Sequence, residues 1–136
     1  MVASKRLLHT MIRVGNLDRS LDFYVGKLGM RELRRQNFPE GRFSLSFIGY
    51  GDEADSAVIE LTDNWDENEY THGSGFGHLA IAVGDVEQVC AQLEQQGVIV
   101  LRSPGPMLHA PDEGIRDVIA FVEDPDGYRI ELIETP

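Results

Sequence analysis

Two histidines and two glutamates of this sequence recur at equivalent places in a duplicated pattern. His9 begins the segment HTMIRVGNLD, and His78 begins the similar segment HLAIAVGDVE. Glu60 lies in the apolar stretch AVIELT, and Glu131 lies in the similar stretch RIELIE. Such a duplication is typical of a chain built from two copies of one structural unit. Each copy then has one histidine at the start of its first strand and one glutamate in its last strand.

Two imidazoles and two carboxylates form a suitable ligand set for a divalent metal ion. An unpaired carboxylate in an apolar layer costs on the order of several kcal/mol, so Glu60 and Glu131 need either water or a positive partner. Zinc, nickel, cobalt and iron(II) all accept mixed nitrogen and oxygen ligands. A single histidine or glutamate in a strand is more often structural or exposed, but four at equivalent repeat positions favour a metal site. His72 and His109 have no counterpart in the other repeat, so we do not expect them to be ligands.

The same repeat predicts the elements that position these residues. Asn16 and Asp85 stand where a helix N-cap is expected, and apolar residues follow each of them at helical spacing. Gly29 and Gly97 supply the C-terminal stops of the two helices. Apolar alternation predicts strands at about 7–14, 31–37, 43–50, 56–62, 77–84, 98–103, 117–123 and 128–134.

Each half is therefore predicted to contain a strand, a helix and three further strands. This order defines an α+β fold made of tandem βαβββ modules. The chain of 136 residues has the length of one domain. We expect a single domain over residues 1–136 that consists of two repeats, at about 5–66 and 74–136.

Composition and charge exclude several classes of protein. No apolar run approaches the roughly 20 residues that a membrane span needs, and the N-terminus has no signal-peptide pattern. A net charge of −11 argues against nucleic-acid binding, and Arg31, Arg34 and Arg35 are expected on the solvated side of a strand. The single cysteine, Cys90, excludes an intrachain disulfide and is expected to be an inert core thiol. We therefore expect a cytoplasmic protein that binds neither membranes nor nucleic acids.

Six motifs together resemble one known family over nearly the whole chain. The sequence is similar to the glyoxalase I family, the lactoylglutathione lyases of the vicinal-oxygen-chelate superfamily. This resemblance implies the fold of the glyoxalase, bleomycin-resistance and dihydroxybiphenyl-dioxygenase proteins. Related dioxygenases and fosfomycin-resistance enzymes use two histidines and one glutamate, and related epimerases tend to have glutamine where Glu60 stands, so the acid favours the lyase. The motifs are LLHTMIRVGNLDRSLDFY, LGM, FIGYG, AVIELTDNW, GFGHLAIAV and IAFVEDPDGYRIELIE.

The resemblance implies a carbon–sulfur lyase that detoxifies methylglyoxal. Its substrate would be the hemithioacetal of methylglyoxal and glutathione, and its product S-D-lactoylglutathione. By similarity, His9, Glu60, His78 and Glu131 would bind one divalent metal ion per site. Glu131 would be the catalytic base, and Glu60 would act on the other hemithioacetal enantiomer from the opposite side of the substrate.

The resemblance also implies the remaining contacts of the site. Arg13 would bind the γ-glutamyl carboxylate of glutathione, and Asn64 would donate a hydrogen bond beside it. The compact chain resembles the bacterial subgroup that is activated by nickel or cobalt, although the ligands accept zinc as well. In this superfamily the two half-sites come from one chain or from two, and relatives of this length are expected to be homodimers, in which His9 and Glu60 of one chain would meet His78 and Glu131 of its partner.

One region departs from the family pattern. Residues 107–117 read MLHAPDEGIRD, an acidic stretch without the lysine that bacterial relatives use for the glycine carboxylate of glutathione. Ser74 stands where eukaryotic relatives have an arginine. Arg116 or His109 could substitute for the missing cation. Two alternatives therefore remain open: a lyase that uses another thiol, and a non-catalytic protein that sequesters a ligand on the same fold, as resistance proteins do.

Overall fold

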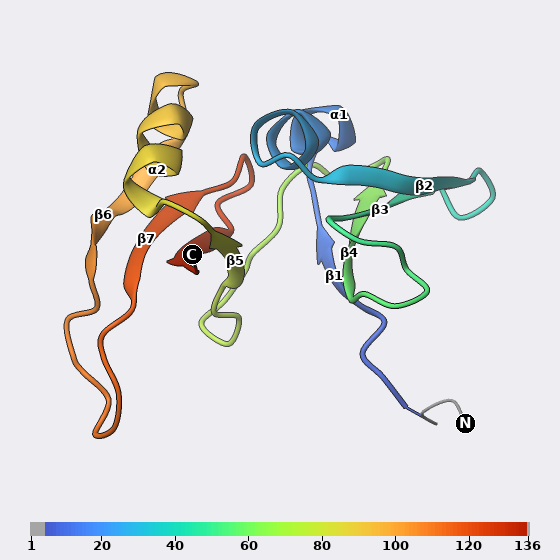
Figure 1. Ribbon diagram of the computed structural model, residues 1–136. Coiled ribbons are helices and arrows are strands. Elements are labelled where there is room, and N and C mark those ends of the chain that lie inside the picture. Colours follow the sequence, from blue (N-terminus) through green and yellow to red (C-terminus); the bar gives the residue numbers. More distant parts are fainter. Residues whose placement is uncertain (1–4, 136) are drawn as a thin grey trace. The chain divides into compact units, whose positions relative to one another are not determined.

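The protein is described here by a computed structural model that places residues 5–135 (Figure 1). The chain divides into two compact units, residues 1–71 and 72–136. Each unit contains a four-stranded sheet and helical segments that follow its first strand. The α+β fold of tandem βαβββ modules is therefore confirmed.

In the first unit, the first strand pairs with the last. The sheet order is β1-β4-β3-β2, in which β1 and β4 are parallel and the other neighbours are antiparallel. Its elements are β1 (His9–Arg13), α1 (Leu17–Leu21), the π-helix η1 (Asp22–Lys27), β2 (Arg31–Phe38), β3 (Phe43–Gly49) and β4 (Val58–Asn64).

The second unit repeats this topology. The sheet order is β5-β8-β7-β6, and β5 again runs parallel to the last strand, β8. All the predicted strands are present, with ends that differ by a few residues from the predicted ones. The elements are β5 (Leu79–Val83), α2 (Val86–Gln95), β6 (Ile99–Pro106), β7 (Val118–Glu123) and β8 (Arg129–Glu134).

Both helices begin and end where the sequence predicts. The Asn16 side chain accepts a hydrogen bond from the backbone N–H of Arg19, and Asp85 accepts one from Gln88, each at 3.0 Å. These bonds satisfy N–H groups that have no partner within the helix. Gly29 has a φ of 77° and Gly97 a φ of 85°, the left-handed conformation that ends a helix at low cost.

The interior of the first helix differs from the prediction. A continuous α-helix was expected from Leu17 to the stop at Gly29, but the α-helical hydrogen bonds end with α1 and η1 follows. The N–H of Leu28 bonds to the carbonyl of Phe23, five residues earlier, at 2.9 Å. The second helix is α-helical throughout. The sequence periodicity does not distinguish these two hydrogen-bond patterns.

Each sheet buries one face against its own helical segment. Because side chains alternate across a strand, neighbouring positions of β1 separate into a buried set and an exposed set. Ile12 and Val14 are buried with the helix, whereas Met11 and Arg13 are exposed on the other face together with His9. We call the two sides the helix face and the open face. The buried apolar residues of the second unit include Ile81, Val86, Cys90, Leu93, Val122, Ile130 and Leu132.

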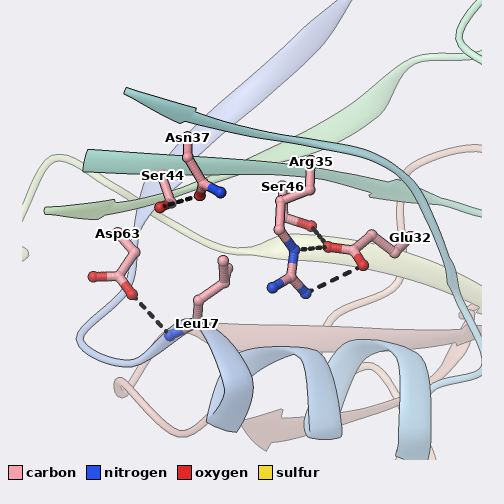
Figure 2. Close-up of polar contacts among 7 residues, drawn as sticks. All are labelled: Leu17, Glu32, Arg35, Asn37, Ser44, Ser46 and Asp63. Carbon is pink, nitrogen blue, oxygen red and sulfur yellow. Dashed lines mark hydrogen bonds and ion pairs between the residues drawn. The ribbon is translucent and has the colours of Figure 1, made fainter. Parts of the chain in front are cut away.

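Polar contacts also hold the first helix against its sheet (Figure 2). The backbone N–H of Leu17 donates to the Asp63 carboxylate at 3.2 Å. In the second unit, the N–H of Val86 donates to Glu134 at 3.1 Å. Each helix therefore has an acidic partner in the last strand of its own unit, and this pairing was not anticipated from the sequence.

A second group of contacts on the helix face centres on Glu32. Its carboxylate accepts hydrogen bonds from Arg35 at 2.8 and 3.2 Å and from the hydroxyl of Ser46 at 2.6 Å (Figure 2). Burial raises the pKa of Glu32, but the hydrogen bonds from Arg35 and Ser46 outweigh it, and the pKa lies below its ordinary value. Arg35 is thus exposed, as predicted, but it is paired with Glu32.

Candidate metal centre

His9 and Glu60 lie side by side on the open face of the first sheet. His9 is the first residue of β1, and Glu60 lies in the neighbouring parallel strand β4, opposite Met11. The His9 Nε2 atom is 3.5 Å from the Glu60 Oε2 atom. The His9 side chain is 36% exposed and the Glu60 side chain is 15% exposed. The His9–Glu60 pair is therefore partly exposed and accessible to a ligand.

His78 and Glu131 form the equivalent pair on the open face of the second sheet. His78 immediately precedes β5, and Glu131 lies in the parallel strand β8, opposite Ala80. The His78 Nε2 atom is 3.1 Å from the Glu131 Oε1 atom. The parallel pairing of first and last strands brings the two residue types together in both units. Glu131, which lies between Ile130 and Leu132, thus has a polar partner.

The distances within the pairs suit two ligands of one metal ion. Zinc–nitrogen and zinc–oxygen bonds of about 2.0–2.2 Å place adjacent donor atoms of one ion roughly 3 Å apart. Both histidine–glutamate pairs have donor separations close to that value. Within residues 5–135, no group of three or more His, Cys, Asp or Glu side chains forms a metal-binding cluster. Each unit therefore has one pair of possible metal donors, a histidine and a glutamate.

A phenylalanine packs against each of these histidines. Phe47 of β3 is paired with Glu60 in the strand register, and its ring lies edge-on to His9 with centroids 5.5 Å apart. Phe121 of β7 is paired with Glu131, and its ring lies edge-on to His78 at 5.2 Å. The sequence reasoning missed both rings. Each ring lies in the strand that precedes an IEL stretch, and this shared position is the signal that could have found them.

The two residues that the family resemblance assigns to glutathione lie at the end of the first pair of parallel strands. Arg13 is the last residue of β1 and lies opposite Thr62 of β4. Asn64 ends β4, and its amide donates to the hydroxyl of Tyr70 at 3.2 Å. By strand alternation Arg13 is on the same face as His9, and Asn64 on the same face as Glu60.

The remaining histidines and the cysteine do not join these pairs. His72 stacks on Tyr128 with ring centroids 4.0 Å apart, and His109 is exposed in the 107–117 segment. Cys90 is 3% exposed, and burial together with the nearby Glu94 carboxylate raises the pKa of its thiol. The prediction that Cys90 is a core residue is confirmed, and a raised pKa disfavours the reactive thiolate.

The 107–117 segment connects β6 and β7 at the surface of the second unit. The N–H of Met107 bonds to the carbonyl of Asp117 at 2.9 Å, which closes its base. Leu108 is 77% exposed and Ile115 is 87% exposed. The segment that departs from the family pattern therefore carries both its acidic and its apolar side chains into solvent.

The first unit also has a hollow of about 440 Å³ on its helix face, lined in part by Asp18, Arg35, Asp63 and Trp65. Its polar groups bond within the protein: the Trp65 indole donates to Ser44 at 2.9 Å. Among the described residues, every buried polar side-chain atom has a hydrogen-bond partner. The hollow does not include His9 or Glu60.

None of the helices that the structure places in residues 5–135 is long and apolar enough to cross a membrane.

The fold and the paired open-face residues agree with one protein family. The model of the Glyoxalase/Bleomycin resistance protein/Dioxygenase superfamily matches residues 6–132. The chain therefore belongs to this superfamily.

Its relatives include proteins named as lyases. The lactoylglutathione lyase of Neisseria meningitidis serogroup A is 57% identical over 129 residues, which cover 95% of this chain and 90% of that protein. Glyoxalase I from Zea mays has a TM-score of 0.88 at 41% identity; the match covers 97% of this chain but 45% of the maize chain. The trypanothione-dependent glyoxalase I of Leishmania major has a TM-score of 0.82 at 45% identity, covering 96% of this chain and 87% of that chain.

Proposed function

We propose that this protein is a lactoylglutathione lyase that converts the hemithioacetal of methylglyoxal and glutathione to S-D-lactoylglutathione. The observation that carries the proposal is the pair of equivalent histidine–glutamate contacts, one on the open face of each repeat. The high identity to a named lactoylglutathione lyase over 95% of the chain supports the same activity. We further propose that residues 1–136 form one domain made of repeats at about 5–66 and 74–136.

His9, Glu60, His78 and Glu131 would together hold one divalent metal ion. Two neutral imidazoles and two carboxylates form a ligand set of net charge −2, which neutralises the charge of such an ion. When bound, the ion would act as a Lewis acid that stabilises the negative charge developing on the two adjacent substrate oxygens. Nickel or cobalt is the proposed metal, and zinc is compatible with the same donors.

Glu131 would move one proton between two neighbouring carbons of the substrate. Its carboxylate takes the proton from the carbon that is bonded to sulfur, and the electron pair of that C–H bond shifts toward the adjacent carbonyl. The same carboxylic acid then returns the proton to the former carbonyl carbon, and the hydroxyl proton of the carbon bonded to sulfur passes to the former carbonyl oxygen, which leaves a thioester and a hydroxyl group. No atom is gained or lost, so a single group can act first as base and then as acid. Glu60 is the equivalent group for the opposite enantiomer.

Arg13 and Asn64 would hold the glutathione part of the substrate. The net charge of −11 opposes the approach of an anion, so a local cation is required. Arg13 supplies a cation on the open face of the strand that begins at His9, and Asn64 supplies an amide at the end of the adjacent strand.

The complete four-ligand site would form in a cytoplasmic homodimer. In this arrangement, His9 and Glu60 of one chain meet His78 and Glu131 of the partner chain. A twofold axis then generates two identical sites from two half-sites per chain. Because each unit has one histidine–glutamate pair, two pairs must meet to supply four ligands.

Thioester formation on metal-free protein tests the proposal. The protein is stripped of metal, supplied with methylglyoxal and glutathione, and assayed after addition of nickel, cobalt or zinc. We expect no activity without metal and the highest activity with nickel or cobalt. Dominant activity with zinc would contradict the metal assignment, and inactivity with all three ions would contradict the lyase assignment.

A lyase that uses another thiol is the second candidate. The acidic 107–117 segment without lysine favours it, because the glycine carboxylate of glutathione would lack the cation used by bacterial relatives. The same assay with trypanothione in place of glutathione distinguishes the two candidates. A higher kcat/KM with trypanothione would establish the second one.

A further inference from the structure

Arg34 makes the first histidine–glutamate pair part of a larger contact chain. In the strand register, Arg34 of β2 lies opposite Phe47 of β3, which in turn lies opposite Glu60 of β4. The guanidinium carbon of Arg34 lies 3.7 Å from the centroid of the Phe47 ring. The same ring is edge-on to His9. Phe47 therefore contacts a cation on one side and the imidazole of His9 on another.

The burial of Phe47 shows how closely it is covered. Phe47 is 3% exposed although it lies on the open face, where the His9 side chain is 36% exposed. Arg34 is itself held in place, because its Nε atom donates to the Glu53 carboxylate at 2.8 Å. The guanidinium is thus fixed between a carboxylate and an aromatic face. A ring that is covered in this way has little freedom to rotate away from its neighbours.

The second unit has an arginine at the equivalent position that does something else. Arg102 of β6 lies opposite Phe121, and in both units a β-bulge immediately precedes the arginine. The Arg102 guanidinium donates to the carbonyls of Gly105 at 2.8 Å and Ile119 at 3.0 Å. Phe121 is correspondingly only half-buried. The cationic cover of the ring is thus a feature of the first half-site.

We propose that Arg34 is a positioning residue that acts on His9 through Phe47. The stacked guanidinium holds the ring, and the ring edge holds the imidazole in the orientation that faces Glu60. Residues behind metal ligands increase affinity by fixing the ligands before the ion binds. The proposal rests on the proposed metal site. It assigns Arg34 a larger effect on the metal affinity of the His9–Glu60 pair than Arg102 has on that of the His78–Glu131 pair.

Arg31 provides a matched control on the same strand. It pairs with Asp52 at 3.3 Å, as Arg34 pairs with Glu53. Arg31→Gln and Arg34→Gln therefore each remove one ion pair between β2 and the loop that joins β3 to β4. Only Arg34→Gln also uncovers the Phe47 ring. A role limited to the surface ion pair predicts equal effects of the two substitutions.

The first measurement is nickel affinity, determined by competition titration of the metal-free full chain. We expect Arg34→Gln to raise the dissociation constant roughly two- to fivefold, the size of a partly exposed cation–π contact, while Arg31→Gln leaves it unchanged. Arg34→Lys keeps the charge and should recover part of the loss. In the Phe47→Leu background, Arg34→Gln should have no further effect on the dissociation constant, because the ring that transmits it is gone.

The second measurement is made without metal. The imidazole proton shifts of His9 are compared in the wild-type protein and the variants by NMR, with His78 as the internal reference. We expect Arg34→Gln to shift the His9 signals and to leave those of His78 in place. Unchanged His9 signals, or equal nickel affinities of the Arg31 and Arg34 variants, would overturn the role of Arg34. A wild-type protein that binds no nickel, cobalt or zinc would overturn the metal site itself, which separates failure of the proposed function from failure of the Arg34 role.

Discussion

The two repeats share their backbone pairing but surround their histidines differently. Both place a histidine and a glutamate on adjacent parallel strands and a phenylalanine beside the histidine. In the first repeat the phenylalanine is buried under Arg34, whereas in the second repeat Phe121 is half-buried and Arg102 is bonded to the backbone. The histidine–glutamate pair is thus common to both repeats, and the contacts of the phenylalanine beside the histidine differ.

The helices show a second difference of the same kind. The N-caps Asn16 and Asp85 are equivalent, as are the stops Gly29 and Gly97, but the first interval contains one more residue. In the first unit this residue is accommodated by η1, whose hydrogen bonds span five residues instead of four. A single inserted residue can be absorbed in this way without moving either helix end. The N-cap and the C-terminal glycine are therefore equivalent in the two repeats, whereas the hydrogen-bond pattern of the helix between them is not.

Loss of the histidine–glutamate pairs should have the largest effect on activity. One variant carries His9→Ala with Glu60→Ala, and the other carries His78→Ala with Glu131→Ala. Each variant alone should be inactive, because each would spoil both sites of a homodimer. Co-refolding should restore activity, since a mixed dimer combines the intact first repeat of one chain with the intact second repeat of the other.

The control for this experiment is verification of mixed dimers with two different affinity tags. Active mixed dimers would support sites shared between chains. Inactive mixed dimers of confirmed composition would contradict them, because sites formed within one chain cannot be restored by mixing.

The two glutamates should differ in their effect on catalysis. Glu131→Gln is nearly isosteric and should keep the fold, but removal of a general base typically lowers kcat by roughly 10²–10⁴-fold. Glu60→Gln should have a smaller effect on the natural mixture of enantiomers. Bound metal is measured beside kcat, since loss of a ligand would also lower activity. Equal losses of kcat in the two metal-loaded variants would contradict the proposed difference in role between Glu131 and Glu60.

Much of the fold was predictable because its signals are local and repeated. Asn16, Asp85, Gly29 and Gly97 mark the helix ends by the chemistry of their own side chains or backbone. The strands follow from the apolar alternation, and the duplication shows that His9 and His78 are equivalent. What the sequence could predict about the candidate site is therefore the histidine and the glutamate that recur in both halves and lie side by side in each.

The remaining parts of the site depend on which strands are neighbours. The contact between Arg34 and Phe47 requires the pairing of β2 with β3, including the bulge that sets its register. The prediction that Arg34 lies on the solvated side of its strand was incomplete, because the side chain is exposed but covers a ring. Asp63 and Glu134 contact the helix starts for a similar reason. These contacts follow from sheet topology, which single-strand periodicity does not specify.

The helix N-caps should have a smaller effect, on stability alone. Asp85→Ala removes an acceptor for the N–H of Gln88, and such substitutions typically cost about 1 kcal/mol of unfolding free energy. Asp85→Asn is the matched control, since asparagine caps a helix about as well as aspartate. Asn16→Ala should cost a similar amount, and urea denaturation measures all three variants. A cost for Asp85→Asn equal to that of Asp85→Ala would show that charge matters more than the hydrogen bond.

The smallest effects should come from the acids that reach the helix starts from the last strands. The Asp63 carboxylate accepts from the N–H of Leu17, and the Glu134 carboxylate accepts from the N–H of Val86. Asp63→Asn and Glu134→Gln keep an oxygen that can accept this bond but remove a negative charge near the positive end of the helix, an interaction of roughly 0.3–1 kcal/mol. The helical segment of the first unit continues from α1 into η1, so the two helix starts have comparable dipoles. Glu134→Gln and Asp63→Asn should therefore lower the unfolding free energy by similar amounts that shrink at high salt, as measured by urea denaturation at low and high salt. Equal losses that do not depend on salt would show that the hydrogen bond, and not the charge, is what the two repeats have in common.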